Sequence, residues 1–225
     1  MAINASKVKT ASNRIEQPNL EPGPYPARLV QIIDLGLQPQ RPYKGVEKPP
    51  AHELMVTYEL SDAFMIDKEG NDLEDKPRWV SETFPLNNIS ADLAKSTKRY
   101  VAFDPNISDG GDWSKQIGKP CTVNIINNES KGKVYDNVDS VAPMRARDAA
   151  KLPELVNPSR VFDLDNPDME VFNSFPDWIK EKITSNLTFS GSLLEGLLKG
   201  APAKDQPPRA EVSPDAQEGD EERPF

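Results

Sequence analysis

Two groups of cationic side chains have the types and spacing to hold a polyanion. They lie in residues 38–51 and in the short stretch 128–133. The first group is Arg41, Tyr43, Lys44 and Lys48, and the second is Lys131 and Lys133. Such cations can follow the phosphates of a nucleic-acid strand, and a ring such as that of Tyr43 can stack on a base. Each lysine alone is equally consistent with an ordinary solvated surface charge.

The C-terminal end carries a second chemical pattern. It reads Glu218-Gly219-Asp220-Glu221-Glu222-Arg223-Pro224-Phe225. A terminal phenylalanine offers an apolar anchor for a pocket, and its carboxylate can pair with a basic side chain. The neighbouring acids would speed association with a basic partner. The alternative is an acidic tail that only increases solubility.

Five strands are expected to position these groups. Alternating apolar residues and flanking turn residues predict them at about 25–37, 52–60, 78–86, 121–127 and 134–141. The cleanest alternation is that of Leu54, Val56, Tyr58 and Leu60. Between the third and fourth strands, the sequence predicts a helix that Ser90 caps and Pro105 ends.

This order is that of the OB-fold, a partly open Greek-key barrel that binds oligonucleotides across strands 2–3 and the loops joining strands 1–2 and 4–5. We therefore predict a mainly β protein: a five-stranded OB-fold barrel with a helix between strands 3 and 4. Both cationic loops would then flank one groove, with Arg28, Trp79 and Tyr135 on its floor. Ordinary core positions are the alternative for Trp79 and Tyr135, and another small α+β fold is the alternative for the barrel.

Composition along the chain predicts four regions. They are a flexible arm (1–20), the OB-fold domain (21–142), a helical extension (143–200) and a disordered acidic tail (201–225). Helix signals in the extension occur at 167–185 and around Leu193 to Leu198. These helices are expected either to cap the barrel or to form a self-association surface that makes a homo-oligomer.

The balance of charges weighs against a nucleic-acid partner, because the net charge is −9 and such binders usually carry a basic surface. Much of the acidic excess lies in the tail. A single cysteine and a single histidine leave no disulfide, no zinc set and little for a catalytic triad, so we expect no enzyme, no metal and no cofactor. The polar N-terminus lacks a signal peptide's apolar run, and no stretch is long and apolar enough for a membrane helix. A soluble, cytoplasmic protein is expected.

The C-terminal end closely resembles the tip of bacterial single-stranded DNA-binding proteins: a spacer, clustered acids and a final Pro-Phe. Arg223 stands where the bacterial tip usually has an apolar residue. With the strand order, the chain is similar to the single-stranded DNA-binding proteins of tailed phages, whose acidic tails end in an aromatic residue. A Gly23-Pro24-Tyr25 start and a Gly118-Lys119 turn are also similar to phage proteins.

The resemblance implies a protein that coats single-stranded DNA in phage replication, recombination or repair, in the host cytoplasm. It implies that the tip recruits partner enzymes through Asp220, Glu221, Glu222, Pro224 and Phe225. The alternative function is a protein-interaction or virion-associated β-domain that does not bind DNA.

Overall fold

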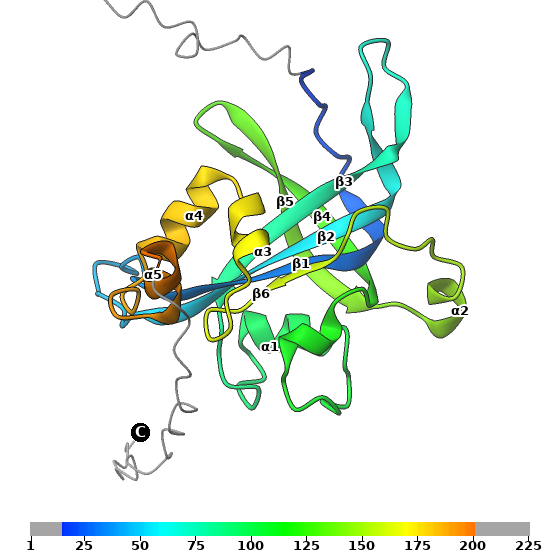
Figure 1. Ribbon diagram of the computed structural model, residues 1–225. Coiled ribbons are helices and arrows are strands. Elements are labelled where there is room, and N and C mark those ends of the chain that lie inside the picture. Colours follow the sequence, from blue (N-terminus) through cyan, green and yellow to red (C-terminus); the bar gives the residue numbers. More distant parts are fainter. Residues whose placement is uncertain (1–14, 201–225) are drawn as a thin grey trace, which may run out of the picture.

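The computed structural model describes residues 15–200 (Figure 1). Long strands dominate it, and its helices are short. The strands are β1 (Gly23–Gln38), β2 (Ala51–Ile66), β3 (Asp72–Pro85), β4 (Pro120–Ser130), β5 (Lys133–Pro143) and β6 (Arg160–Phe162). The helices are α1 (Lys95–Tyr100), the 3₁₀ turn η2 (Trp113–Gln116), α2 (Ala146–Ala149), α3 (Met169–Ser174), α4 (Asp177–Thr184) and α5 (Leu193–Leu198).

One six-stranded sheet holds these elements together. Its order is β3-β2-β1-β4-β5, with antiparallel neighbours, and β6 adds to β1 in parallel. The mainly β prediction is confirmed. A closed five-stranded barrel is not confirmed, because within residues 15–200 no ladder of backbone hydrogen bonds joins the two end strands, β3 and β5.

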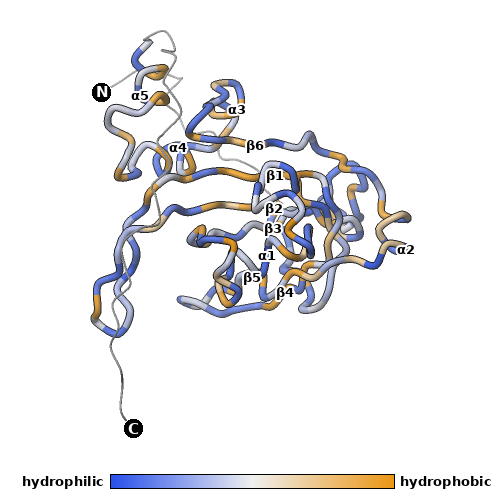
Figure 2. The backbone as a smooth tube through the Cα atoms, turned by 90° about the horizontal axis from the view of Figure 1, so that it is seen from below, coloured by the Kyte–Doolittle hydropathy of each residue, from blue (hydrophilic) through white to orange (hydrophobic). Residues whose placement is uncertain are grey.

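Strand β1 is buried on both sides, as its apolar residues on both faces suggest. One side, with Leu29 and Ile32, faces a core built with β2–β5, α1 and Trp113. The other side, with Ile33 and Leu35, faces a second core under α3, α4 and α5. Figure 2 shows these three helices on one side of β1 and β2, and α1, β4 and β5 on the other. The helical extension therefore covers the part of the outer face formed by β1 and β2, as expected if it caps the sheet.

Local chemistry explains how the extension is held. Asp168 caps α3 by accepting hydrogen bonds from the backbone N–H groups of Glu170 and Val171. Gly36 in β1 has φ +74°, and a Cβ there would lie 2.7 Å from Asn186. Only glycine combines that backbone conformation with so close an approach, so this position fixes the extension against the bend in β1.

Three predicted boundaries differ from the structure. The helix expected to begin at Ser90 is shorter and is formed by α1 alone. Around Ser90 the chain forms a turn instead, because the side chain of Asn88 accepts hydrogen bonds from the N–H and the hydroxyl of Ser90. Strands β2 and β3 extend through the expected turn region to a tight connection at 67–71. In the expected connector after residue 142, β6 adds a strand that no sequence pattern indicated.

None of the helices in residues 15–200 is both long enough and apolar enough to cross a membrane.

Candidate nucleic-acid interface

The open edge between β3 and β5, called the seam below, is closed by side chains. Arg78 of β3 forms an ion pair with Asp136 of β5 at 3.1 Å. Further along, Arg99 of α1 binds Glu82 of β3 and donates to the carbonyl of Asp139 of β5 at 2.8 Å. The partner numbers rise together along both strands, so β3 and β5 run parallel at the seam. Figure 1 shows the two strands near one another.

The Arg99 contact is a buried cluster. Its guanidinium makes two hydrogen bonds to Glu82, at 2.7 and 3.2 Å, and both side chains are almost fully buried. The Tyr58 hydroxyl donates to the same carboxylate at 2.8 Å. Burial and the adjacent Glu82 raise the pKa of Tyr58 well above its ordinary value, so its hydroxyl remains a donor. Lys95 adds an ion pair at 2.7 Å from a more exposed position.

The last residues of the predicted N-terminal arm bind at the same seam. Arg78 donates to the carbonyl of Pro18 at 2.6 Å, and Asp136 accepts from the backbone N–H of Leu20 and the side chain of Asn19. Gln17 pairs with the backbone of Ile66 through two hydrogen bonds, at 2.8 and 3.1 Å. The segment 17–20 is therefore anchored, and residues 1–14 of the predicted arm lie outside the described part of the chain.

Two aromatic rings flank the seam on its outer side. Because successive side chains of a strand alternate between faces, Trp79 points away from the side on which Arg78 meets Asp136, and Tyr135 does likewise. Trp79 is 40% exposed and Tyr135 is 49% exposed. These exposures exclude the alternative that both rings are ordinary core residues. The Trp79 indole N–H donates to Glu59 at 3.0 Å, so the ring faces outward with its polar atom already paired.

The two predicted lysines of the β4–β5 hairpin lie on the same element as Tyr135. Lys131 and Gly132 form its two-residue turn, with φ +52° and +71°, and Ser130 pairs with Lys133. Both central residues have positive φ, the pattern of a type I′ turn, whose twist matches that of the strands. Lys133 therefore shares a face of β5 with Tyr135, two residues away, and Lys131 lies in the turn that begins this strand.

The cationic loop between β1 and β2 forms its own compact tip. Tyr43 and Val46 exchange two backbone hydrogen bonds, at 2.9 and 3.0 Å, around Lys44 and Gly45. The ammonium groups of Lys44 and Lys48 lie 5.4 and 5.0 Å from the centre of the exposed Tyr43 ring, and Arg41 is also exposed. In Figure 1 this loop, beside α5, and the β4–β5 hairpin are separate projections. No described hydrogen bond or ion pair joins them, so the predicted cations form two groups.

Arg28 has a different neighbourhood from the one predicted. Its guanidinium donates to the carbonyls of Gly118, Leu152 and Pro153, at 3.0, 3.2 and 2.8 Å. Its side chain is mostly buried beneath the connector that follows β5. In the sheet register, Arg28 of β1 lies opposite Glu59 of β2, and Glu59 lies opposite Trp79 of β3. Arg28 is therefore on the same face of the sheet as Trp79, but its guanidinium binds the connector.

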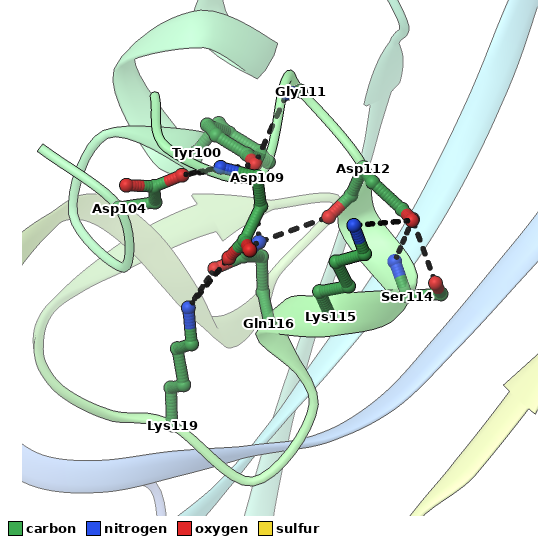
Figure 3. Close-up of polar contacts among 9 residues, drawn as sticks. All are labelled: Tyr100, Asp104, Asp109, Gly111, Asp112, Ser114, Lys115, Gln116 and Lys119. Carbon is green, nitrogen blue, oxygen red and sulfur yellow. Dashed lines mark hydrogen bonds and ion pairs between the residues drawn. The ribbon is translucent and has the colours of Figure 1, made fainter. Parts of the chain in front are cut away.

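A polar network closes the acidic loop between α1 and β4 (Figure 3). Asp104 accepts from the Tyr100 hydroxyl and from the backbone N–H of Asp109, the latter at 2.8 Å. Lys119 donates to Asp109 at 3.1 Å and to Gln116 at 2.7 Å. Burial raises the pKa of Tyr100 to about 12, which keeps this hydroxyl protonated. Within residues 15–200 no group of three or more His, Cys, Asp or Glu side chains is placed to hold a metal ion.

Acid should loosen this loop. A hydrogen bond from the backbone of Asp109 lowers the pKa of Asp104, and Lys119 lowers the pKa of Asp109, both from an ordinary value of 3.8. Carboxyls with depressed folded-state pKa values stabilise the fold above that ordinary value and lose the contribution as pH falls through the folded-state pKa. We expect the NMR shift of the Asp109 amide proton to titrate with a midpoint below pH 3.8. A midpoint at or above that value would contradict the network, and Asp104→Asn should leave only the smaller shift that comes from the Asp109 carboxyl itself.

Sequence reasoning missed Glu59, which binds the Trp79 ring, and Arg78 and Asp136, which join the two strands that carry the rings. Charged residues inside strands give no local signal of their partners. The predicted docking residues Asp220, Glu221, Glu222, Pro224 and Phe225 lie outside residues 15–200.

The sequence matches no protein-family model, and no curated protein is similar enough to be recognised as a relative. The candidate interface is therefore defined by its own geometry: two half-exposed rings across the seam and two lysines on the adjoining turn.

Proposed function

We propose that this protein binds single-stranded DNA without strong sequence preference and catalyses no reaction. The observation that carries the proposal is the pair of half-exposed rings, Trp79 and Tyr135, on either side of the seam. Aromatic faces stack on any base, so a surface built on them tolerates sequence. Lys131 and Lys133 on the adjoining turn would meet the phosphates, and the Tyr43 tip with Arg41, Lys44 and Lys48 would form a second contact.

The strand arrangement supports an OB-type barrel as the finer description of the fold. The path β3-β2-β1-β4-β5 has the connectivity of such a barrel, and β3 and β5 are the strands that would meet to close it. Here Arg78 and Arg99 bridge that position through side chains. An OB-fold is partly open, so a seam of this kind is compatible with it.

The resemblance of the C-terminal end supports a role in phage replication, recombination or repair. In this proposal the strand is coated and protected by the β-rich body. Partner enzymes are then recruited through Asp220, Glu221, Glu222, Pro224 and Phe225. An acidic end suits a basic partner surface because opposite charges raise the rate of encounter.

The net charge of −9 favours a second candidate, a protein-interaction β-domain that does not touch DNA. The experiment that separates the two is filter binding to labelled oligo-dT at about 50 and 200 mM salt. The proposal predicts retention at low salt and a steep loss at high salt, because counterions return to the phosphates. A protein that fails to retain oligo-dT at low salt, with or without residues 201–225, would exclude DNA binding.

A further inference from the structure

A buried carboxylate lies directly behind the exposed ring of Trp79. Glu59 of β2 is only 3% exposed and accepts four hydrogen bonds. One comes from the Trp79 indole N–H at 3.0 Å, and the others come from the backbone N–H of Val156 and from the backbone and side chain of Asn157. A carboxylate this buried is tolerated because both of its oxygens accept hydrogen bonds, one on Oε1 and three on Oε2.

These donors belong to two different parts of the chain. Trp79 is on β3, whereas Val156 and Asn157 are in the connector between α2 and β6. Arg28 binds the same connector a few residues earlier, by donating hydrogen bonds to the carbonyls of Leu152 and Pro153. Glu59 is thus fixed from behind by the connector, and in turn it fixes the orientation of the indole.

We propose that Glu59 is a positioning residue for single-stranded DNA binding, one that acts through Trp79. The inference rests on the proposed function and names how one of its contacts is held. A ring held in its binding orientation loses less conformational freedom when a base stacks on it. Because its only polar atom is paired with Glu59, the exposed part of the ring offers stacking but no hydrogen bond to a base edge. That property favours binding of any base.

The test is a double-mutant cycle in the full-length protein with Glu59→Gln and Trp79→Phe, measured as affinity for oligo-dT at several salt concentrations. Glu59→Gln keeps the side-chain size but removes the charge and one of the two acceptor oxygens, so four donors compete for a single neutral carbonyl oxygen and the hold on the indole is weakened. Trp79→Phe keeps an aromatic ring without the N–H. We expect Glu59→Gln to lower the affinity by roughly tenfold, within the range for losing one stacked base. The slope of affinity against salt should not change, because no phosphate contact is removed.

The decisive comparison is Glu59→Gln in the Trp79→Phe background. The effects of two substitutions that break the same hydrogen bond do not add. In the Trp79→Phe background, Glu59→Gln should therefore cause no further loss of affinity. Asn157→Ala is the matched comparison: it removes one of the four donors to Glu59 but leaves the indole bond, so the Trp79 Nε1–H signal should persist and the affinity should fall by less than in Glu59→Gln.

The outcomes separate the inference from the proposed function. If the wild type does not bind oligo-dT, the proposed function fails. If Trp79→Phe, whose ring can still stack on a base, binds as tightly as the wild type, the held indole is not needed and the inference alone is overturned. If Trp79→Phe binds more weakly but Glu59→Gln binds like the wild type, or is equally damaging in both backgrounds, the inference alone is overturned. Should Glu59→Gln not fold, Trp79→Phe decides, since binding equal to the wild type would show that the held indole is not needed.

Discussion

Replacing Arg99 with methionine should lower the free energy of unfolding by about 3–5 kcal/mol, the usual cost of removing one partner of a buried ion pair. The change leaves Glu82 in the interior without its two hydrogen bonds from the guanidinium. It also removes the donor to the Asp139 carbonyl, and with it one of the two bridges across the seam. Chemical denaturation followed by circular dichroism measures the loss.

Lys95→Met is the matched control for this prediction. Lys95 pairs with the same carboxylate at 2.7 Å, but its side chain is 45% exposed. Exposed pairs contribute about 0–1 kcal/mol, so this variant should be close to the wild type. A second variant, Glu82→Gln with Arg99→Met, should be more stable than Arg99→Met alone, because it removes a buried charge that has lost its buried partner and keeps only the half-exposed Lys95. Equal losses for Lys95→Met and Arg99→Met would contradict the buried seam cluster.

The largest expected effect on binding comes from removing both rings at the seam. Trp79→Ala and Tyr135→Ala should each weaken oligo-dT binding by about 1–3 kcal/mol, the range for one stacked base. The rings sit on different strands, so the double variant should lose more than either single one. Fluorescence anisotropy with a labelled oligonucleotide measures the affinities, and the salt dependence should be retained because Lys131 and Lys133 remain.

Trp178→Ala controls for a general loss of exposed aromatic surface. Trp178 is 56% exposed, more than Trp79, but it lies on α4 in the helical extension. Its removal should leave the affinity unchanged. If Trp178→Ala weakens binding as much as Trp79→Ala does, the seam is not the specific contact surface.

The sequence predicted those parts of the fold that depend on neighbours in the chain. The apolar and turn residues around 25–37 predicted β1, and the apolar residues on its two faces pack into two cores. The alternation from Leu54 to Leu60 placed the centre of β2. The Lys131-Gly132 turn follows from the preference of glycine for positive φ.

Contacts between residues that are far apart in the sequence could not be predicted from these local patterns. Arg28 was predicted to lie on the floor of the DNA-binding groove, but the carbonyls that hold it lie about 90 and 125 residues away. The seam was missed because Arg78 and Asp136, or Glu82 and Arg99, are unremarkable as isolated charges in the sequence. Strand β6 is only three residues long, too short for alternation to reveal it.

The most direct test of the central claim is an NMR titration of the isotope-labelled, full-length protein with oligo-dT. The proposal predicts that amide signals of residues 78–81 and 133–136, together with the Trp79 indole signal, shift first and furthest. Smaller shifts are expected at the tip around Tyr43. Spectra that do not change, or shifts confined to the helical extension, would contradict the claim that the seam between β3 and β5 is a binding surface for single-stranded DNA.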